Sequence, residues 1–250
     1  MKKSYLYKTT ILSVLLVSFL VIAGCSSGGG GSASPITSAN VIYVSDFLPV
    51  PGDDATAFKT FLEAAGHTVT IILVADIVST DFSTANLIIV KTSALSASDW
   101  NGAFAAHAAA LYATQKPILS IYLGDYLFDS TAFYLFIDHG QSASGNASSV
   151  KVDNAGDQFW STPHSIAVTT GVNLAIYTSA QPDEEVYWSS PPATAHKFVT
   201  EPSNSGYSVL NYQLINSTRY FHWGTEGKPT DMTTDGQNLF LNVVYWMVNG

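Results

Sequence analysis

The chain has 250 residues, 47% of them hydrophobic and 12% aromatic, which suits a folded domain with a sizeable core and not a disordered chain. Its formal net charge is −9 at pH 7, and because no basic run interrupts this acidic excess, a nucleic-acid partner is not expected. Cys25 is the single cysteine, which excludes disulfides within the chain and zinc sites built from several thiolates.

Residues 1–24 have the layout of a secretory signal peptide. Lys2, Lys3 and Lys8 form a positive start, and the apolar run of residues 11–23 follows them. The run is shorter than the roughly 20 apolar residues that a bilayer-spanning helix needs. We therefore predict a cleaved leader and not a permanent transmembrane helix.

The four residues Ile22-Ala23-Gly24-Cys25 resemble the lipobox of bacterial lipoproteins, in which the cysteine is acylated and becomes the new N-terminus. The resemblance implies a lipid anchor at Cys25, with palmitate-type acyl chains, and an extracytoplasmic position on the cell envelope. The alternative is an ordinary secretory leader with an incidental cysteine. Ser26 is not the Asp that retains lipoproteins at the inner membrane, so outer-membrane or surface placement is expected.

Residues 25–39 are predicted to be a flexible tether, because Ser, Gly, Ala and Pro dominate them and cannot bury apolar surface. Residues 40–250 then form one domain. Without the leader, the chain keeps seven basic residues against nineteen acidic ones, a formal charge near −12.

The first half of this domain alternates strands and helices. Near-continuous apolar runs predict strands at residues 40–46, 68–74, 85–92 and from Pro117, with helices at about 53–65 and 98–114. Alternation of this kind predicts an α/β fold: a doubly wound, mostly parallel, flavodoxin-like sheet with helices on both faces.

The second half is expected to add short strands to this sheet. A loop is predicted over residues 140–157, and a final amphipathic helix within residues 233–250. Between them lie the strand candidates "HSIAV", "NLAIYTS", "EEVYWS", "HKFVT", "YSVLNYQ" and "TRYFHW".

The central stretch "PILSIYLGDYLF", beginning at Pro117, resembles the signature of class I glutamine amidotransferases, in which a strand delivers a catalytic Cys to a tight turn. Gly124 keeps that pattern, whereas Tyr122 stands where the family has its Cys and Tyr126 where Gln is usual. The aromatic-rich final helix also looks like that of the trehalose-utilisation relatives of this family. The resemblance implies the amidotransferase-like fold.

The resemblance does not imply glutaminase activity, because glutamine hydrolysis needs a thiolate beside a His. The phenol of Tyr122 is bulkier than a thiol and is mostly protonated at neutral pH, so it is no substitute. Ser120 lies two residues before the turn, and the domain has no Gly-x-Ser-x-Gly motif. Glutaminase activity is therefore excluded, and an enzyme of another kind is not favoured.

His222, in "RYFHWGTE", occupies the place of the family's catalytic His, but Glu226 follows it by four residues and not by two. One interpretation puts His222 at the carboxyl end of a strand, facing the turn at Tyr122. The other makes it a buried imidazole within an aromatic cluster.

No cofactor or metal site is predicted, because the six His residues are scattered and no His-Glu-x-x-His occurs. Asp138-His139 is interpreted as the polar end of a helix. The acidic run Asp183-Glu184-Glu185 is interpreted as solvated, with calcium as a weaker alternative.

We therefore expect a non-catalytic ligand-binding or interaction module. Its crevice would be lined by Asp46, Tyr122, Gly124, Asp125 and His222, with Glu226 as a further candidate. The expected partners are a neutral polar ligand such as a carbohydrate, or a cell-envelope protein. The alternative is a hydrolase in which His222 acts with Asp125 or Glu226 to activate water, with or without a metal.

Overall fold

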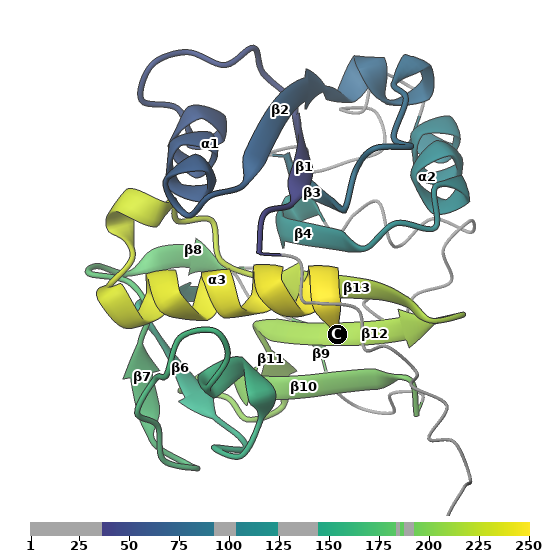
Figure 1. Cartoon of the computed structure of the whole chain (residues 1–250). Helices are drawn as coiled ribbons and strands as arrows, with labels where there is room; N and C mark the ends of the chain where they lie inside the picture. The colour runs from purple at the N-terminus through teal and green to yellow at the C-terminus, as the bar shows by residue number, and fades with distance from the viewer. Residues whose placement is uncertain (1–36, 93–103, 125–144, 184–185, 188–192) are drawn as a thin grey trace, which may run out of the picture. The chain divides into compact units, whose positions relative to one another are not determined.

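A nine-stranded mixed sheet forms the centre of the computed structural model, which describes residues 37–92, 104–124, 145–183, 186–187 and 193–250 (Figure 1). The strand order is β2-β1-β3-β4-β13-β12-β10-β6-β7. Cys25, Asp125, Asp138, His139, Glu184 and Glu185 lie outside the described residues.

The first five strands of this order are parallel to one another. They are β2 (Thr68–Leu73), β1 (Asn40–Ser45), β3 (Leu87–Thr92), β4 (Ile118–Tyr122) and β13 (Thr218–Trp223). Five parallel strands with β1 between β2 and β3 match the flavodoxin-like order.

The remaining four strands continue the sheet as antiparallel neighbours. They are β12 (Leu210–Ile215), β10 (Ala195–Thr200), β6 (Ser149–Val152) and β7 (Asn173–Ala175). Two small two-stranded sheets lie beside this half: β5 (Gly145–Ala147) with β8 (Gln181–Asp183), and β9 (Val186–Tyr187) with β11 (Tyr207–Ser208).

Three α-helices and three 3₁₀ turns complete the described part. The helices are α1 (Asp54–Ala64), α2 (Phe104–Ala113) and α3 (Thr234–Asn249). The 3₁₀ turns are η1 (Val74–Ser79), η3 (Gln158–Trp160) and η4 (Pro229–Asp231). None of the helices in this part of the chain is both long and apolar enough to cross a membrane.

Local chemistry fixes both ends of α1. The carboxylate of Asp53 accepts a hydrogen bond from the backbone N–H of Thr56 at 2.7 Å, which caps the first turn. Gly66 follows the C-cap residue Ala65 with φ of +93°, a left-handed conformation that glycine adopts at little cost. The other carboxylate oxygen of Asp53 accepts from the backbone N–H of Val50 at 2.6 Å, which fixes the loop before α1 to the start of the helix.

Strand β1 shows how the sheet divides the core. Val41 and Tyr43 point to the face covered by α1 and α3, whereas Ile42 and Val44 pack with α2 and η1 on the other face. Alternation with period two is what a strand buried on both faces requires.

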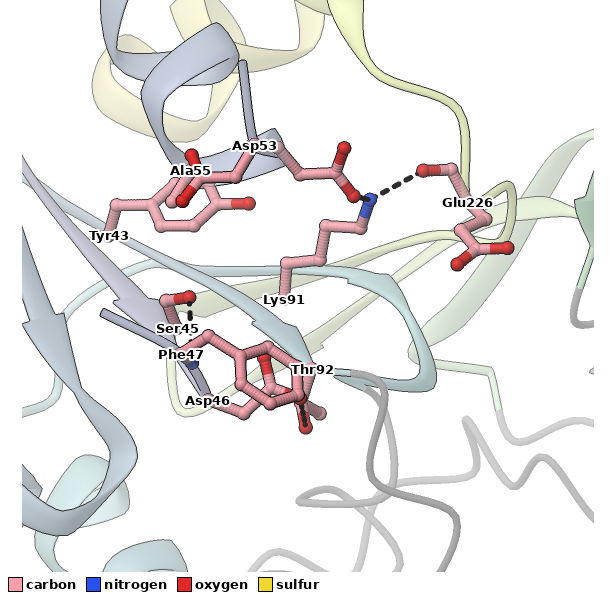
Figure 2. A pocket seen from close by; sticks show the side chains of 10 residues that line it. Tyr43, Ser45, Asp46, Phe47, Asp53, Ala55, Lys91, Thr92 and Glu226 are labelled. Atoms are coloured by element: carbon pink, nitrogen blue, oxygen red, sulfur yellow. Dashed lines mark hydrogen bonds and ion pairs between the residues drawn. The ribbon is translucent and has the colours of Figure 1, made fainter. Parts of the chain in front are cut away.

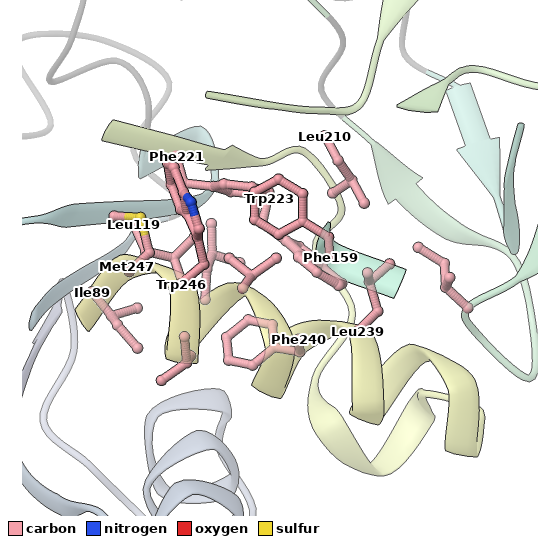
Figure 3. Packing of buried hydrophobic residues seen from close by; sticks show 14 of the residues in the cluster. Ile89, Leu119, Phe159, Leu210, Phe221, Trp223, Leu239, Phe240, Trp246 and Met247 are labelled. Atoms are coloured by element: carbon pink, nitrogen blue, oxygen red, sulfur yellow. The ribbon is translucent and has the colours of Figure 1, made fainter. Parts of the chain in front are cut away.

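Helix α3 packs onto the larger of the two core clusters (Figure 3). Thr233 caps its start by accepting a bond from Gly236 N–H at 3.0 Å. Trp223 and Phe240 meet edge to face at 5.0 Å, and Phe159 from η3 packs against Trp246 at 5.2 Å. These aromatic contacts join the parallel half of the sheet to the antiparallel half through one helix.

The predicted α/β fold with a mostly parallel first half is confirmed, and the predicted strands that became β1, β2, β3, β4, β10, β12 and β13 are present. Two predictions in the second half are wrong. The predicted loop over residues 140–157 contains β5 and β6, and "HSIAV" at residues 164–168 is not a strand. In that segment Asn242 bonds the backbone N–H and C=O of His164, so a side chain replaces the ladder of a strand.

Candidate functional site

The carboxyl ends of β1 and β3 lie side by side at the position where the strand order of the sheet reverses. After β1 the chain runs through α1 to β2 on one side, and β3 then lies on the other side of β1. Loops leaving two such strands diverge and open a crevice between them, which is where open α/β sheets bind ligands.

A pocket of about 320 Å³ occupies this position (Figure 2). A volume of this size suits a small ligand or one functional group of a larger one. Its lining residues come from β1, the loop after it, the first turn of α1, the end of β3 and the loop after β13. They are Tyr43, Ser45, Asp46, Phe47, Asp53, Asp54, Ala55, Lys91, Thr92 and Glu226.

Lys91 is the basic residue of this wall, and it is only 7% exposed. Its ammonium forms an ion pair with Asp54 and donates a hydrogen bond to the carbonyl of Glu226 at 2.6 Å. It also lies 5.8 Å from the centre of the Phe58 ring. Lys91 thus ties β3 to α1 and to the loop after β13, and its charge is neutralised inside the pocket wall.

Tyr43 contributes a buried hydroxyl to the same wall. Its side chain is 1% exposed, and the hydroxyl has no hydrogen-bond partner in the described structure. Burial, followed by the nearby negative charges of Asp54, Asp46 and Asp53, raises the pKa of Tyr43 well above its ordinary value. The phenol is therefore neutral at physiological pH.

The carboxylate of Asp53 is held in place by the hydrogen bonds that cap α1. Although burial acts to raise its pKa, hydrogen bonds from Val50 and Thr56 together with the charge of Lys228 lower the pKa below its ordinary value. The carboxylate is thus ionised at neutral pH and fixed to the loop that borders the pocket.

Asp46 and Thr92 close the pocket at the tips of the two strands. The hydroxyl of Thr92 donates to the Asp46 carboxylate at 3.2 Å, and the backbone N–H of Phe47 donates to Ser45 Oγ at 3.3 Å. Phe47 is 67% exposed, so one aromatic ring at the pocket is in contact with solvent.

The turn that follows β4, which resembles the catalytic turn of the amidotransferases, keeps an unusual backbone. Tyr122 has φ of +51°, a left-handed conformation that costs a bulky residue about 1 kcal/mol or more. Two residues later, Gly124 packs against the backbone of Val90 in β3 with no space for a Cβ atom. The turn after β4 is therefore left-handed at its start and tightly packed on β3, and it carries a phenol at residue 122.

His222 is buried inside the sheet and does not face an open crevice. It pairs with Ser120 across β13 and β4, it is 0% exposed, and its Nδ1 lies 3.2 Å from Ser120 Oγ. Ser120 Oγ is also 3.2 Å from the carbonyl of Phe221, which accepts from it. Strand β13 continues to Trp223, and the imidazole of His222 is buried in the sheet interior, as in the second of the two interpretations.

The structure thus brings together two of the predicted residues, Asp46 and Glu226, in one pocket. Tyr122 and Gly124 lie at the end of β4, beyond β3 from that pocket wall. The sequence motifs did not single out Tyr43, Lys91, Asp53 or Asp54 as site residues. The sequence did contain a signal that could have pointed to Lys91 as a site residue, because it is a charged side chain near the end of the apolar strand "LIIVKT".

Asp183 is not solvated, contrary to the prediction. It is buried at 2% exposure, and neither carboxylate oxygen has a hydrogen-bond partner in the described structure. Burial, together with the negative charge of Glu201, raises its pKa to about 6. Its backbone bridges to Thr225 in the loop after β13. Among the described residues no group of three or more His, Cys, Asp or Glu side chains is placed to hold a metal ion.

No protein-family model matches this sequence, and no curated protein matches it. Among solved structures, the chain is similar to a protein from Thermoplasma acidophilum described as a subunit of GMP synthase, with a TM-score of 0.54 and 11% identity over 84% of this chain and 94% of that one. The CTPS glutaminase domain of Trypanosoma brucei, solved with acivicin, matches with a TM-score of 0.49 and 10% identity over 83% and 93%. The first likeness shows that the chain shares its overall fold with that protein.

Proposed function

We propose that this chain is an extracytoplasmic lipoprotein whose amidotransferase-like domain binds a ligand at the pocket between β1 and β3 and does not hydrolyse glutamine. The observation that carries the proposal is Tyr122. The strained turn that would present a nucleophile is retained with φ of +51°, yet it presents a phenol, and the sequence has no cysteine beyond residue 25.

Binding is supported by the pocket at the reversal of the strand order. It combines carboxylates, hydroxyls and one exposed aromatic ring in a volume of about 320 Å³. A carbohydrate or a side chain of a cell-envelope protein would find hydrogen-bonding groups and a ring face there.

The burial of His222 argues against the alternative function, a hydrolase in which His222 activates water. A general base must reach a substrate or an activated water, and the imidazole has no exposed surface. Its Nδ1 instead lies against Ser120, a member of the adjacent strand.

The membrane anchor is tested with the full chain and a Cys25→Ala variant expressed in a bacterial host fed with labelled palmitate. We expect label and membrane association in the unmodified chain and neither in the variant. Equal membrane association of both proteins, without label, would refute acylation and favour an uncleaved apolar leader.

The binding function is tested by thermal-shift and calorimetric titrations of the full chain in non-ionic detergent against sugars, amines and cell-envelope fragments. A ligand that binds the unmodified chain and is lost in Glu226→Gln, but is kept in Asp76→Asn, would support the pocket. Asp76 is an exposed carboxylate in η1 and controls for the loss of one negative charge. Release of glutamate from glutamine by the unmodified chain would refute the non-catalytic part.

A further inference from the structure

The pocket between β1 and β3 has an excess of negative charge. Among the described residues that line it, four carry carboxylates, Asp46, Asp53, Asp54 and Glu226, and one carries an ammonium, Lys91. Asp54 is paired with Lys91, and Asp53 is fixed by the start of α1. The pocket therefore attracts positive charge and repels anions.

Glu226 has a carboxylate available for a ligand. Its backbone N–H donates to Pro182 at 2.8 Å and its carbonyl accepts from Lys91 at 2.6 Å, so the backbone is fixed on both sides. Glu226 lines the pocket, and within the described structure its carboxylate forms no hydrogen bond or ion pair with another side chain. A fixed backbone with an uncommitted carboxylate is a preorganised acceptor.

Tyr43 supplies an independent observation that points to a ligand. Tyr43 is one of the residues that line the pocket, and its buried hydroxyl has no hydrogen-bond partner in the described structure. In Figure 2 this hydroxyl points toward Lys91 across the pocket. Leaving such a group unpaired destabilises the fold, and a ligand atom at hydrogen-bond distance would recover that cost.

Phe47 adds a ring at the solvent side. Its side chain is 67% exposed, and it lies in the loop that also exposes Leu48 and Val50. The face of an aromatic ring attracts cations, and its apolar surface suits the alkyl part of an organic cation. A bare metal ion would gain no favourable contact from the apolar side chains of this loop.

We propose that this pocket binds the ammonium or guanidinium group of a small organic cation, with Glu226 and Asp46 as counter-charges, the Tyr43 oxygen as a neutral acceptor and Phe47 against its alkyl part. This inference rests on the proposed binding function and narrows it to one class of ligand. A neutral sugar would use the same hydroxyls but would leave the negative charge uncompensated.

The test compares two probes of nearly the same shape that differ in side-chain charge: Nα-acetyl-arginine methyl ester, a guanidinium cation, and Nα-acetyl-citrulline methyl ester, its neutral urea counterpart. The acetyl group removes the α-ammonium that both free esters would carry. Each is titrated by calorimetry into the full chain in non-ionic detergent. We expect the arginine ester to bind at least 10-fold more tightly, and its affinity to fall when salt is raised from 50 to 500 mM. Glucose is titrated as a neutral polyol.

Variants then locate the interaction. Glu226→Gln is expected to weaken binding of the arginine ester at least 10-fold, and Tyr43→Phe about 3-fold or more, whereas Asp76→Asn leaves it unchanged. Because Tyr43→Phe removes only the hydroxyl, its unchanged or raised melting temperature would show that the weaker binding is not a folding defect.

Equal binding of both esters, or equal losses in Glu226→Gln and Asp76→Asn, would overturn the cation proposal. If glucose binds in a Glu226-dependent manner and the arginine ester does not, the binding function stands and the ligand class is wrong. If neither probe binds and no other ligand depends on Glu226, both proposals fail.

Discussion

Gly124 packs so closely on the carbonyl of Val90 that a Cβ atom on residue 124 would overlap it. Strands β4 and β3 are parallel neighbours, and the turn that begins at Tyr122 passes back over the end of β3. The absence of a side chain at residue 124 is therefore what allows the turn to close with the left-handed backbone of Tyr122.

Gly124→Ala is expected to lower the free energy of unfolding by about 1–3 kcal/mol, because the new methyl group meets backbone that cannot rotate away. Chemical denaturation measures the change. Gly156→Ala is the control, since its nearest neighbour would be a side-chain atom of Asn154 at 3.3 Å. Similar losses in both variants would show that the contact with Val90 has no special cost.

Tyr122→Cys, made in a Cys25→Ala background, is expected to release no glutamate from glutamine. A thiol in the turn would still lack an accessible base, because His222 is fully buried and lies against Ser120. Glutamate is measured by a coupled assay, with thiol titration to confirm that the introduced sulfur is accessible. Turnover above that of Cys25→Ala alone would show that the site keeps a working base.

Lys91→Met is expected to destabilise the fold by about 1–3 kcal/mol, since it removes the partner of Asp54 and leaves the carbonyl of Glu226 without its donor. A double-mutant cycle with Asp54→Asn should give a coupling of about 1 kcal/mol, reduced by solvent because the Asp54 side chain is 41% exposed.

The matched control for this cycle is the exposed pair of Lys59 and Glu63 on α1, whose side chains are 38% and 42% exposed. Its coupling should be about 0.3–0.5 kcal/mol. If the coupling free energy between Lys91 and Asp54 is no larger than that between Lys59 and Glu63, burial of the Lys91 ammonium does not strengthen its ion pair.

Asp183 should make stability fall as pH rises through about 4 to 6. Its pKa in the fold is about 6, above the ordinary 3.8, so the folded state holds the proton more tightly. The stabilisation is complete below about pH 4 and is lost as pH rises through 6, with a total of up to about 3 kcal/mol.

Asp183→Asn should therefore be more stable than the unmodified chain at pH 7.5 and nearly equal to it at pH 4. Urea denaturation across this pH range measures the difference, with Asp76→Asn as the control. A difference between the two proteins that is independent of pH would mean that the carboxyl of Asp183 does not titrate in this window.

The sequence predicted the elements whose signals are local. Apolar runs marked β1, β2, β3 and β4, and Asp53 with Gly66 marked the two ends of α1. Strand β6 and the segment at residues 164–168 were missed because their state depends on distant partners, β10 in one case and Asn242 in the other.

The candidate site shows the same division. The sequence by itself determined that no cysteine lies beyond residue 25 and that Tyr122 ends an apolar strand, because a residue count and a local pattern need no knowledge of tertiary contacts. Only the tertiary structure decided that His222 is buried and that Lys91, Tyr43 and Glu226 share a pocket. These three residues come from β3, β1 and the loop after β13, and the pairing of parallel strands across more than a hundred residues brings them together.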